Sequence, residues 1–215
     1  MLSSWPGVPL RGYRPAEHTY EFLPLDSLPP LDPVDGFDWL GERGERIPET
    51  TADLARLQEL LGPVGVTLPA EFVDFYSWYG WAPTLDLVSA TACYTRLGPE
   101  PKFSPVEPGA FMVRFLNDQQ GSVVWYLYLR PGEPAFVVHG YGLEYDVEEE
   151  DDGPVERTVR RCADSFPEFV RRYWIENRAW AHVTYPQKAG PMAPDCAAYL
   201  AHYTRAASRS AATGS

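Results

Sequence analysis

The chain has 215 residues, of which 45% are hydrophobic and 14% aromatic, and this composition excludes an intrinsically disordered chain. Its formal net charge of −12 repels nucleic-acid phosphates and anionic lipids, which argues against direct binding of DNA, RNA or a membrane surface. The sequence has no apolar run near the roughly 20 residues of a membrane span, no signal-peptide pattern at its start and no disulfide or zinc spacing among its three cysteines, so a cytoplasmic location is expected.

Residues 1–50 are predicted to form an extended arm, because they lack a sustained helical or alternating pattern and are rich in proline. The arm also contains several large aromatic residues, which argue against a free tail. We expect it to pack across the domain or to cover part of a partner site. The aromatic residues concerned are Trp5, Tyr13, Tyr20, Phe22, Phe37 and Trp39.

Two helices are predicted after the arm, over residues 51–61 and 68–80. Leucines recur at spacings of three and four in the first helix, and Gly62 stands where glycine often ends a helix. The second helix has Pro69 in its first turn, where proline is tolerated. We expect one face of it to anchor the core, and that face contains Phe72, Phe75, Tyr76 and Tyr79.

A β-hairpin is predicted from residues 111–116 and 122–129, because both segments are rich in β-branched and aromatic residues and a polar turn joins them. Further strands are expected at residues 134–139 and 143–147, and shorter ones at 85–91 and 155–159. The short connections favour antiparallel pairing. The predicted fold class is therefore α+β, a single domain over residues 51–185 with a central, mainly antiparallel sheet flanked by helices.

The sequence from Ser165 to Glu168 has the pattern of a capping box, in which each of these two side chains bonds an amide at the helix start. A closing helix is expected there, because apolar residues recur at helical spacing after Ser165. Residues 186–215 form a tail rich in alanine, proline and serine, with a short helix predicted over 197–205 and disorder over the last ten residues.

No motif of a known catalytic chemistry is present in the sequence. It has no Gly-x-Ser-x-Gly elbow and no phosphate loop, and its histidines lack metal-ligand spacing. A pair formed by Cys196 and His202 is conceivable, but chance proximity explains these residues more simply. We expect no enzymatic activity, no cofactor and no metal, and an uncharacterised enzyme is the third alternative.

The most unusual local feature is a run of seven acidic residues within residues 144–152. It lacks the ordered spacing and the glycine turn of a calcium loop. A solvated loop is the simpler interpretation, and a binding site for a basic partner is the alternative, because dense negative potential speeds encounter. The acidic residues are Glu144, Asp146, Glu148, Glu149, Glu150, Asp151 and Asp152.

A second candidate site is the aromatic pair Trp78 and Trp81, which stands at the end of the second predicted helix. Tryptophan is enriched in protein-binding hot spots. Aromatic side chains beside a helix end also cap the core of many domains. Both interpretations are open for this pair.

Three motifs in this order resemble the SUKH superfamily, which includes fungal Smi/Knr-type regulators and many bacterial immunity proteins. The first is Leu68-Pro69-x-x-Phe72-x-x-Phe75-Tyr76-x-x-x-Gly80, in which Tyr79 stands where the family often has asparagine. The second is the hairpin from Phe111 to Leu129, and the third runs from Ala163 to Val170. The resemblance covers about residues 51–180 and leaves both ends unexplained.

The resemblance implies an α+β domain whose bacterial relatives bind and neutralise a co-produced toxin, in many cases a nuclease or a nucleic-acid deaminase. We therefore expect a non-catalytic immunity protein that binds a cognate, basic toxin. Its predicted contacts are the 144–152 run, an exposed sheet edge, Trp78 and Trp81. The alternative function is a regulatory or scaffold protein of the same fold without a toxin partner.

Overall fold

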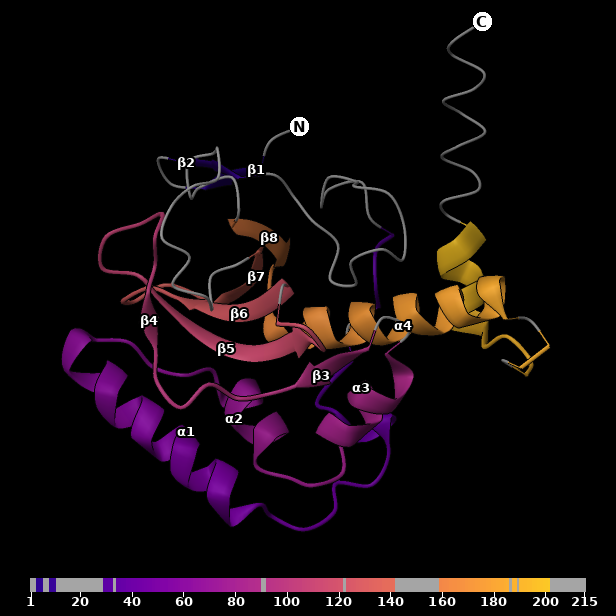
Figure 1. The fold of residues 1–215 in the computed structure, drawn as a ribbon, viewed down its shortest axis with the longest axis horizontal. Helices are drawn as coiled ribbons and strands as arrows, with labels where there is room; N and C mark the ends of the chain where they lie inside the picture. The colour runs from indigo at the N-terminus through magenta and orange to yellow at the C-terminus, as the bar shows by residue number, and fades with distance from the viewer. Residues whose placement is uncertain are drawn as a thin grey trace, which may run out of the picture.

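The computed structural model describes residues 3–5, 8–10, 29–32, 34–89, 92–121, 123–141, 159–185, 187–188 and 190–201. These residues form one α+β domain in which helices pack on an antiparallel sheet (Figure 1). The predicted fold class is therefore confirmed. Among the described helices, none combines the length and the apolar character needed to cross a membrane.

The central sheet has six strands in the order β3-β5-β6-β7-β8, with β4 also paired to β5. All the pairings are antiparallel. The predicted hairpin is present as β5 and β6, in which Val113 lies opposite Leu127. The strand bounds are β3 Cys93–Thr95, β4 Lys102–Phe103, β5 Phe111–Asp118, β6 Val123–Leu129, β7 Phe136–Tyr141 and β8 Val159–Ala163.

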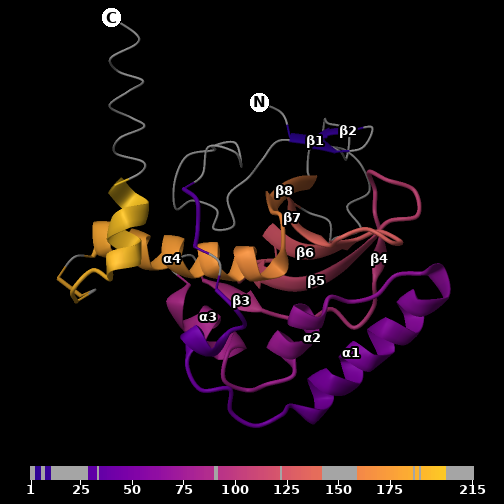
Figure 2. The same ribbon diagram turned by 180° about the vertical axis from the view of Figure 1, so that it is seen from behind.

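The helices lie mainly on one face of this sheet. In Figures 1 and 2, α1, α2 and α3 are on the side of β5 away from β7, and α4 runs along the sheet. Every residue of β6 is buried, because side chains on both of its faces are covered. The bounds are η2 Asp38–Leu40, α1 Pro48–Leu61, η3 Gly62–Val64, α2 Ala70–Tyr76, α3 Ala82–Val88 and α4 Phe166–Thr184.

Aromatic rings form the centre of the core, around Phe166 at the start of α4. Its ring centroid lies 4.9 Å from that of Phe72, 5.3 Å from that of Phe75 and 5.2 Å from that of Phe115. All four side chains are almost completely buried. Burying each of them stabilises the fold by about 2 kcal/mol, so the closing helix, α2 and the sheet are joined by one cluster.

The described part of the N-terminal arm packs against the domain, as its aromatic residues predicted. Phe37 is buried, and its ring lies 5.0 Å from that of Phe75 and 5.4 Å from that of Trp81. Trp39 packs edge-on against Trp174 of α4 at 5.5 Å. Two short strands, β1 Ser3–Trp5 and β2 Val8–Leu10, pair antiparallel further upstream.

Some predicted boundaries are wrong. Of the strand expected at residues 85–91, residues 85–88 are instead the last part of α3, whose helical backbone buries Leu85 and leaves Leu87 88% exposed, and residues 90 and 91 lie outside the described residues. The second helix ends at Tyr76, which leaves Tyr79 65% exposed and off the predicted core face. Gly62 keeps right-handed helical angles, and the left-handed turn falls at Gly65 with φ +74°.

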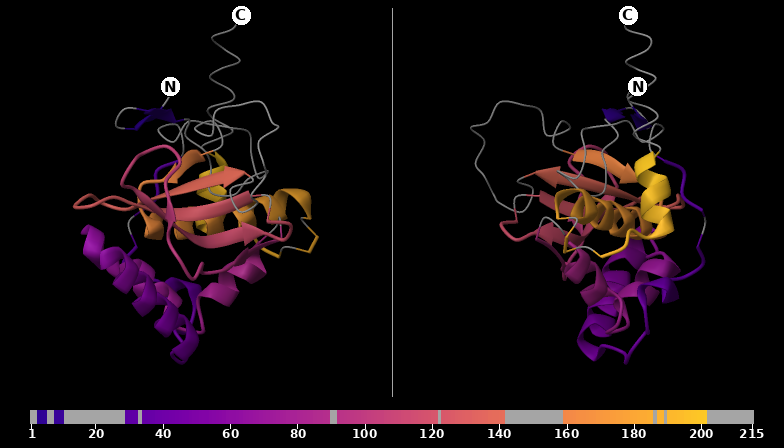
Figure 3. Two further views of the ribbon diagram at one scale, coloured as in Figure 1. Left: turned by 60° about the vertical axis from the view of Figure 1, so that its left-hand side comes forward. Right: turned by 90° about the vertical axis from the view of Figure 1, so that its right-hand side faces the viewer.

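The predictions for the C-terminal part of the chain fall partly within the described residues. Of the strand expected at residues 155–159, only Val159 is described, as the first residue of β8, and residues 155–158 and the strand predicted at 143–147 lie outside the described residues. Residues 194–201 are helical, and this helix stands at the far end of α4 (Figure 3). Residues 202–215 of the tail also lie outside the described part of the chain.

Candidate protein-binding surface

A groove of about 480 Å³ runs between α1 and α2 on the side of these helices away from the core. Most of its lining surface is apolar, and Ala55 of α1 and Val73 of α2 contribute to it. Polar side chains stand at its two ends. The lining residues are Arg46, Thr51, Leu54, Ala55, Gln58, Ala70, Val73, Asp74 and Ser77.

Beside the groove lies a tryptophan–arginine stack, formed by Arg43, Arg46, Trp78 and Trp81. The guanidinium of Arg43 lies 4.8 Å from the ring centroid of Trp78 and 5.0 Å from that of Trp81. Arg46 lies 4.9 Å from Trp78. A cation over an indole face is attracted by the ring quadrupole, so Trp78 is held by arginines from the preceding loop.

Backbone hydrogen bonds place this loop against the end of α2. Arg46 and Trp78 form an isolated antiparallel bridge, and the amide of Tyr79 donates to the carbonyl of Glu45 at 2.9 Å. The amide of Gly80 donates to the carbonyl of Arg43 at 3.0 Å. A Cβ atom at residue 80 would lie 1.8 Å from the carbonyl oxygen of Glu42, so only glycine fits here.

Asp74 connects the groove to the stack. Its carboxylate accepts a hydrogen bond of 2.9 Å from the indole nitrogen of Trp78 and lies 3.6 Å from Arg43. Both charged side chains are about half exposed, so this ion pair adds little stability by itself. The hydrogen bond from the indole nitrogen to Asp74 fixes the rotamer of Trp78 at the edge of the groove.

The two predicted tryptophans have different environments. Trp81 is 0% exposed, and its indole nitrogen donates to the carbonyl of Gly41 at 3.3 Å, so its ring belongs to the core and offers no surface to a partner. Trp78 is only partly buried and contacts Arg46 and Asp74, which line the groove. The seven predicted acidic residues of the 144–152 run, from Glu144 to Asp152, lie outside the described residues.

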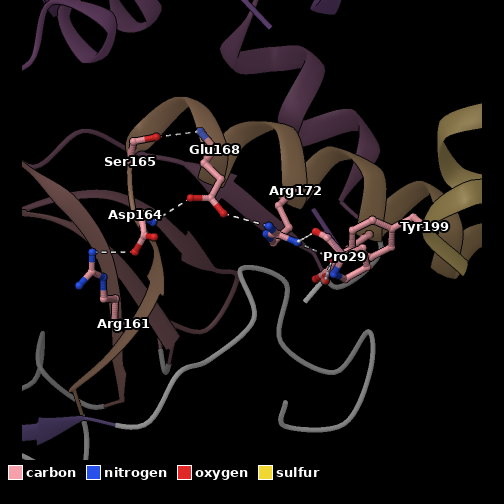
Figure 4. A network of polar contacts seen from close by, with 8 residues as sticks. Pro29, Arg161, Asp164, Ser165, Glu168, Arg172 and Tyr199 are labelled. Atoms are coloured by element: carbon pink, nitrogen blue, oxygen red, sulfur yellow. Dashed lines mark hydrogen bonds and ion pairs between the residues drawn. The ribbon is translucent and has the colours of Figure 1, made fainter. Parts of the chain in front are cut away.

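A buried polar network was not predicted from the sequence. Arg172 of α4 is 4% exposed, and its guanidinium donates to the carbonyl of Pro29 at 3.0 Å, to Tyr199 at 3.1 Å and to Glu168 at 2.9 Å (Figure 4). Tyr199 in turn donates to the buried Glu176 at 2.5 Å. Two cavities of about 270 and 280 Å³ border this region, and Arg171 lines both.

Two buried side chains with titratable groups, His139 and Cys196, have shifted pKa values. Burial, and to a smaller extent the nearby charge of Arg160, lowers the pKa of His139 to about 3, so its imidazole is neutral. Burial raises the pKa of the Cys196 thiol to about 11, the opposite of the shift that activates a nucleophile. His202, its conceivable partner, lies outside the described residues.

No cluster of three or more His, Cys, Asp or Glu side chains that could hold a metal ion occurs in the described part of the chain. No protein-family model, curated protein or solved structure matches the chain. The resemblance to the SUKH superfamily therefore stays a prediction from three sequence motifs. What the geometry offers is a preformed apolar groove beside a fixed tryptophan, which is an arrangement suited to protein binding.

Proposed function

We propose that this chain is a non-catalytic protein-binding protein of the SUKH immunity type, which binds and neutralises a cognate, basic toxin in the cytoplasm. The observation that carries the proposal is the α1–α2 groove with Trp78 at its edge, on a chain whose net charge is −12. The alternative is that the same surface has a regulatory or scaffold role without a toxin partner. The experiment below distinguishes these two functions.

Trp78 has the properties of a binding hot spot. Tryptophan and arginine are enriched in hot spots, where one side chain often contributes 2 kcal/mol or more. Arg43, Arg46 and Asp74 already hold the ring of Trp78 in one position. A partner would therefore order few side chains on this surface, and less of the contact energy is lost as entropy on binding.

The charge of the chain supports a basic partner. The acidic run from Glu144 to Asp152 contributes seven of the thirty acidic residues. Negative potential of this density raises the rate of encounter with a cationic protein, and the effect weakens with salt. We assign the run a steering role and the groove a docking role.

The edge of the sheet is the third part of the proposed contact surface. On this edge, Tyr94 of β3 is 46% exposed and Phe103 of β4 is 78% exposed. Large aromatic side chains at an exposed strand edge suit pairing with another chain. This edge is an additional contact, and the proposal depends on it less than on the groove.

The test is affinity capture of the tagged full-length protein from its native cells, at low and at moderate salt, followed by mass spectrometry. We expect one basic toxin-like domain whose recovery falls as salt rises. Replacing Trp78 with alanine should weaken binding of that domain by about 30-fold, equivalent to about 2 kcal/mol. Replacing Glu148, Glu149 and Glu150 with lysine should slow association and reduce its salt dependence.

The matched control is Tyr185→Ala, which removes a 48% exposed aromatic side chain at the end of α4, away from the groove. It should leave binding unchanged, and thermal melts should show that all the variants are folded. Recovery of regulatory or envelope proteins instead of a toxin would favour the scaffold function. Recovery of no specific protein at either salt concentration would contradict the proposal.

A further inference from the structure

We propose that the α1–α2 groove receives an amphipathic helix of the partner, with aliphatic side chains in the groove and lysine or arginine along its borders. This inference rests on the proposed function and adds the chemistry of the partner segment. Its first support is the shape of the site. The walls are helices, and the lining surface, to which Ala55 and Val73 contribute, is mostly apolar and open to solvent.

The length of the groove fits about two turns of a helix. Its lining residues on α1 extend from Thr51 to Gln58, which corresponds to about 10 Å at the helical rise of 1.5 Å per residue. Two turns of a partner helix place apolar side chains at positions i and i+4 on one face. Alanines at 55 and 70 leave the space that such side chains need.

Both ends of the groove are fixed before a partner arrives. At one end, Gln58 donates to the carbonyl of Val66 at 3.1 Å and accepts from the amide of Leu68 at 2.9 Å. At the other end, the amide of Ile47, just before α1, donates to the carbonyl of Ser77, just after α2, at 3.0 Å. Because these bonds hold α1 and α2 together, the groove keeps its width without a ligand.

The borders of the groove are acidic. Residues 42–77 contain seven acidic and three basic side chains, a local net charge of −4. Asp74 lines the groove, Glu71 follows the lining residue Ala70, and Glu59 lies one turn beyond Ala55. Glu59 and Glu71 are both exposed to solvent.

The net charge of −4 already includes the three arginines of this region, one of which, Arg46, lines the groove itself. Arg56 is 2.7 Å from Glu100, Arg43 lies against Asp74 and two tryptophan rings, and Arg46 lies over Trp78. Each is already engaged by groups of this chain. Charge complementarity therefore favours a partner helix with cationic side chains beside its apolar stripe.

The experiment is an NMR titration of the full-length, ¹⁵N-labelled protein with three peptides of about 15 residues, long enough to form helix. The first carries leucine at i and i+4 with lysine on the flanks. The second has glutamate in place of lysine, and the third has the lysine composition with its apolar residues scrambled. We expect only the first peptide to shift the amide signals of Thr51, Ala55 and Val73.

The blocking variant is Ala55→Phe, which fills the groove from an exposed position of α1. It should weaken binding of the lysine-flanked helix by about tenfold or more. The matched control is Leu60→Phe, which enlarges an exposed side chain on the face of α1 opposite the lining residues, and it should leave the affinity unchanged.

Several results would overturn the inference. One is equal binding of the scrambled peptide or the glutamate peptide. Another is that the lysine-flanked helix shifts the amide signals of other residues, or shifts none in the groove. A further one is a shift of the groove signals that grows with protein concentration alone. The last would identify a second copy of this chain as the occupant. If cell capture still yields a salt-sensitive basic toxin, only the helix inference fails; if capture yields no toxin, the proposed function fails as well.

Discussion

At the scale of single residues, Gly80 determines how closely the 41–47 loop approaches the end of α2. We predict that Gly80→Ala lowers the free energy of unfolding by about 2–4 kcal/mol, because the new methyl group would lie 1.8 Å from the carbonyl oxygen of Glu42 and the backbone would have to move. Urea denaturation monitored by tryptophan fluorescence measures the change.

The control for Gly80 is Gly62→Ala. Gly62 has helical angles, and a Cβ atom there meets nothing within 4 Å. Alanine at this position should change the stability by only about 1 kcal/mol in either direction, because the restriction of the unfolded chain is opposed by the preference of a residue before Pro63 for extended angles. A Gly80→Ala variant as stable as the wild type would show that the loop moves at little cost.

His139 gives the molecule a predicted pH dependence. Its pKa is about 3 in the folded protein, mainly because of burial, and about 6.5 in an unfolded chain. The unfolded state therefore binds more protons between these values, so the stability from this residue is complete above about pH 6.5 and is lost as pH falls towards 3. The slope from one such group is at most about 1.4 kcal/mol per pH unit.

The measurement is the free energy of unfolding at several pH values between about 4.5 and 7, for the wild type and for His139→Gln. The variant should show a shallower slope, whatever its absolute stability. Taking the difference between the two slopes removes the contribution of carboxylates common to both proteins. Parallel slopes would mean that His139 is protonated, or exposed, in the folded protein.

At the scale of secondary structure, Ser165 begins α4. Its side chain accepts a hydrogen bond of 3.3 Å from the amide of Glu168, as the capping box predicted. The glutamate reaches back to the amide of Asp164 at 3.0 Å, one residue before the expected partner. Ser165→Ala should cost about 1 kcal/mol of stability, whereas Ser165→Asp should retain most of it. Equal losses in both variants would exclude the cap as the cause, and urea midpoints measure them.

The elements that could be predicted from the sequence are those with a strong local pattern. The leucine spacing of α1, the apolar run of β6 and the Ser165 cap were sufficient to place these elements. The segment Leu85–Val88 was misassigned because its alternating apolar residues also fit a short helix with one buried leucine. Tyr79 was assigned to the core because the sequence does not show that α2 stops at Tyr76.

The candidate site was less predictable than the fold. Trp78 could be singled out from its residue type, but the sequence could not distinguish its exposure from the burial of Trp81 three residues later. The groove depends on how α1 and α2 lie beside each other, and the arginine stack depends on the bridge between Arg46 and Trp78. These are contacts between separate segments, which periodicity within one segment does not encode.

At the scale of the whole molecule, the chain holds both of its outer segments on α4 through one buried side chain. Arg172 bonds Pro29, which precedes α1, and Tyr199 in the last described helix, as well as Glu168 in its own helix. The polar partners of Arg172 are 143 residues upstream and 27 residues downstream. A single substitution should therefore affect both ends at once.

We predict that Arg172→Met lowers the free energy of unfolding by about 3 kcal/mol, because methionine keeps the packing of the stem but leaves the buried carbonyl of Pro29 and the hydroxyl of Tyr199 without their charged donor. Amide hydrogen exchange should speed up in residues 29–32 and 194–201 more than in β5 and β6. The matched control is Arg56→Met, since its exposed ion pair with Glu100 joins neither end of the chain and should contribute about 1 kcal/mol or less. Exchange that rises equally throughout the molecule would mean that Arg172 stabilises the core as a whole. It would contradict a specific role of Arg172 in holding residues 29–32 and 194–201 on α4.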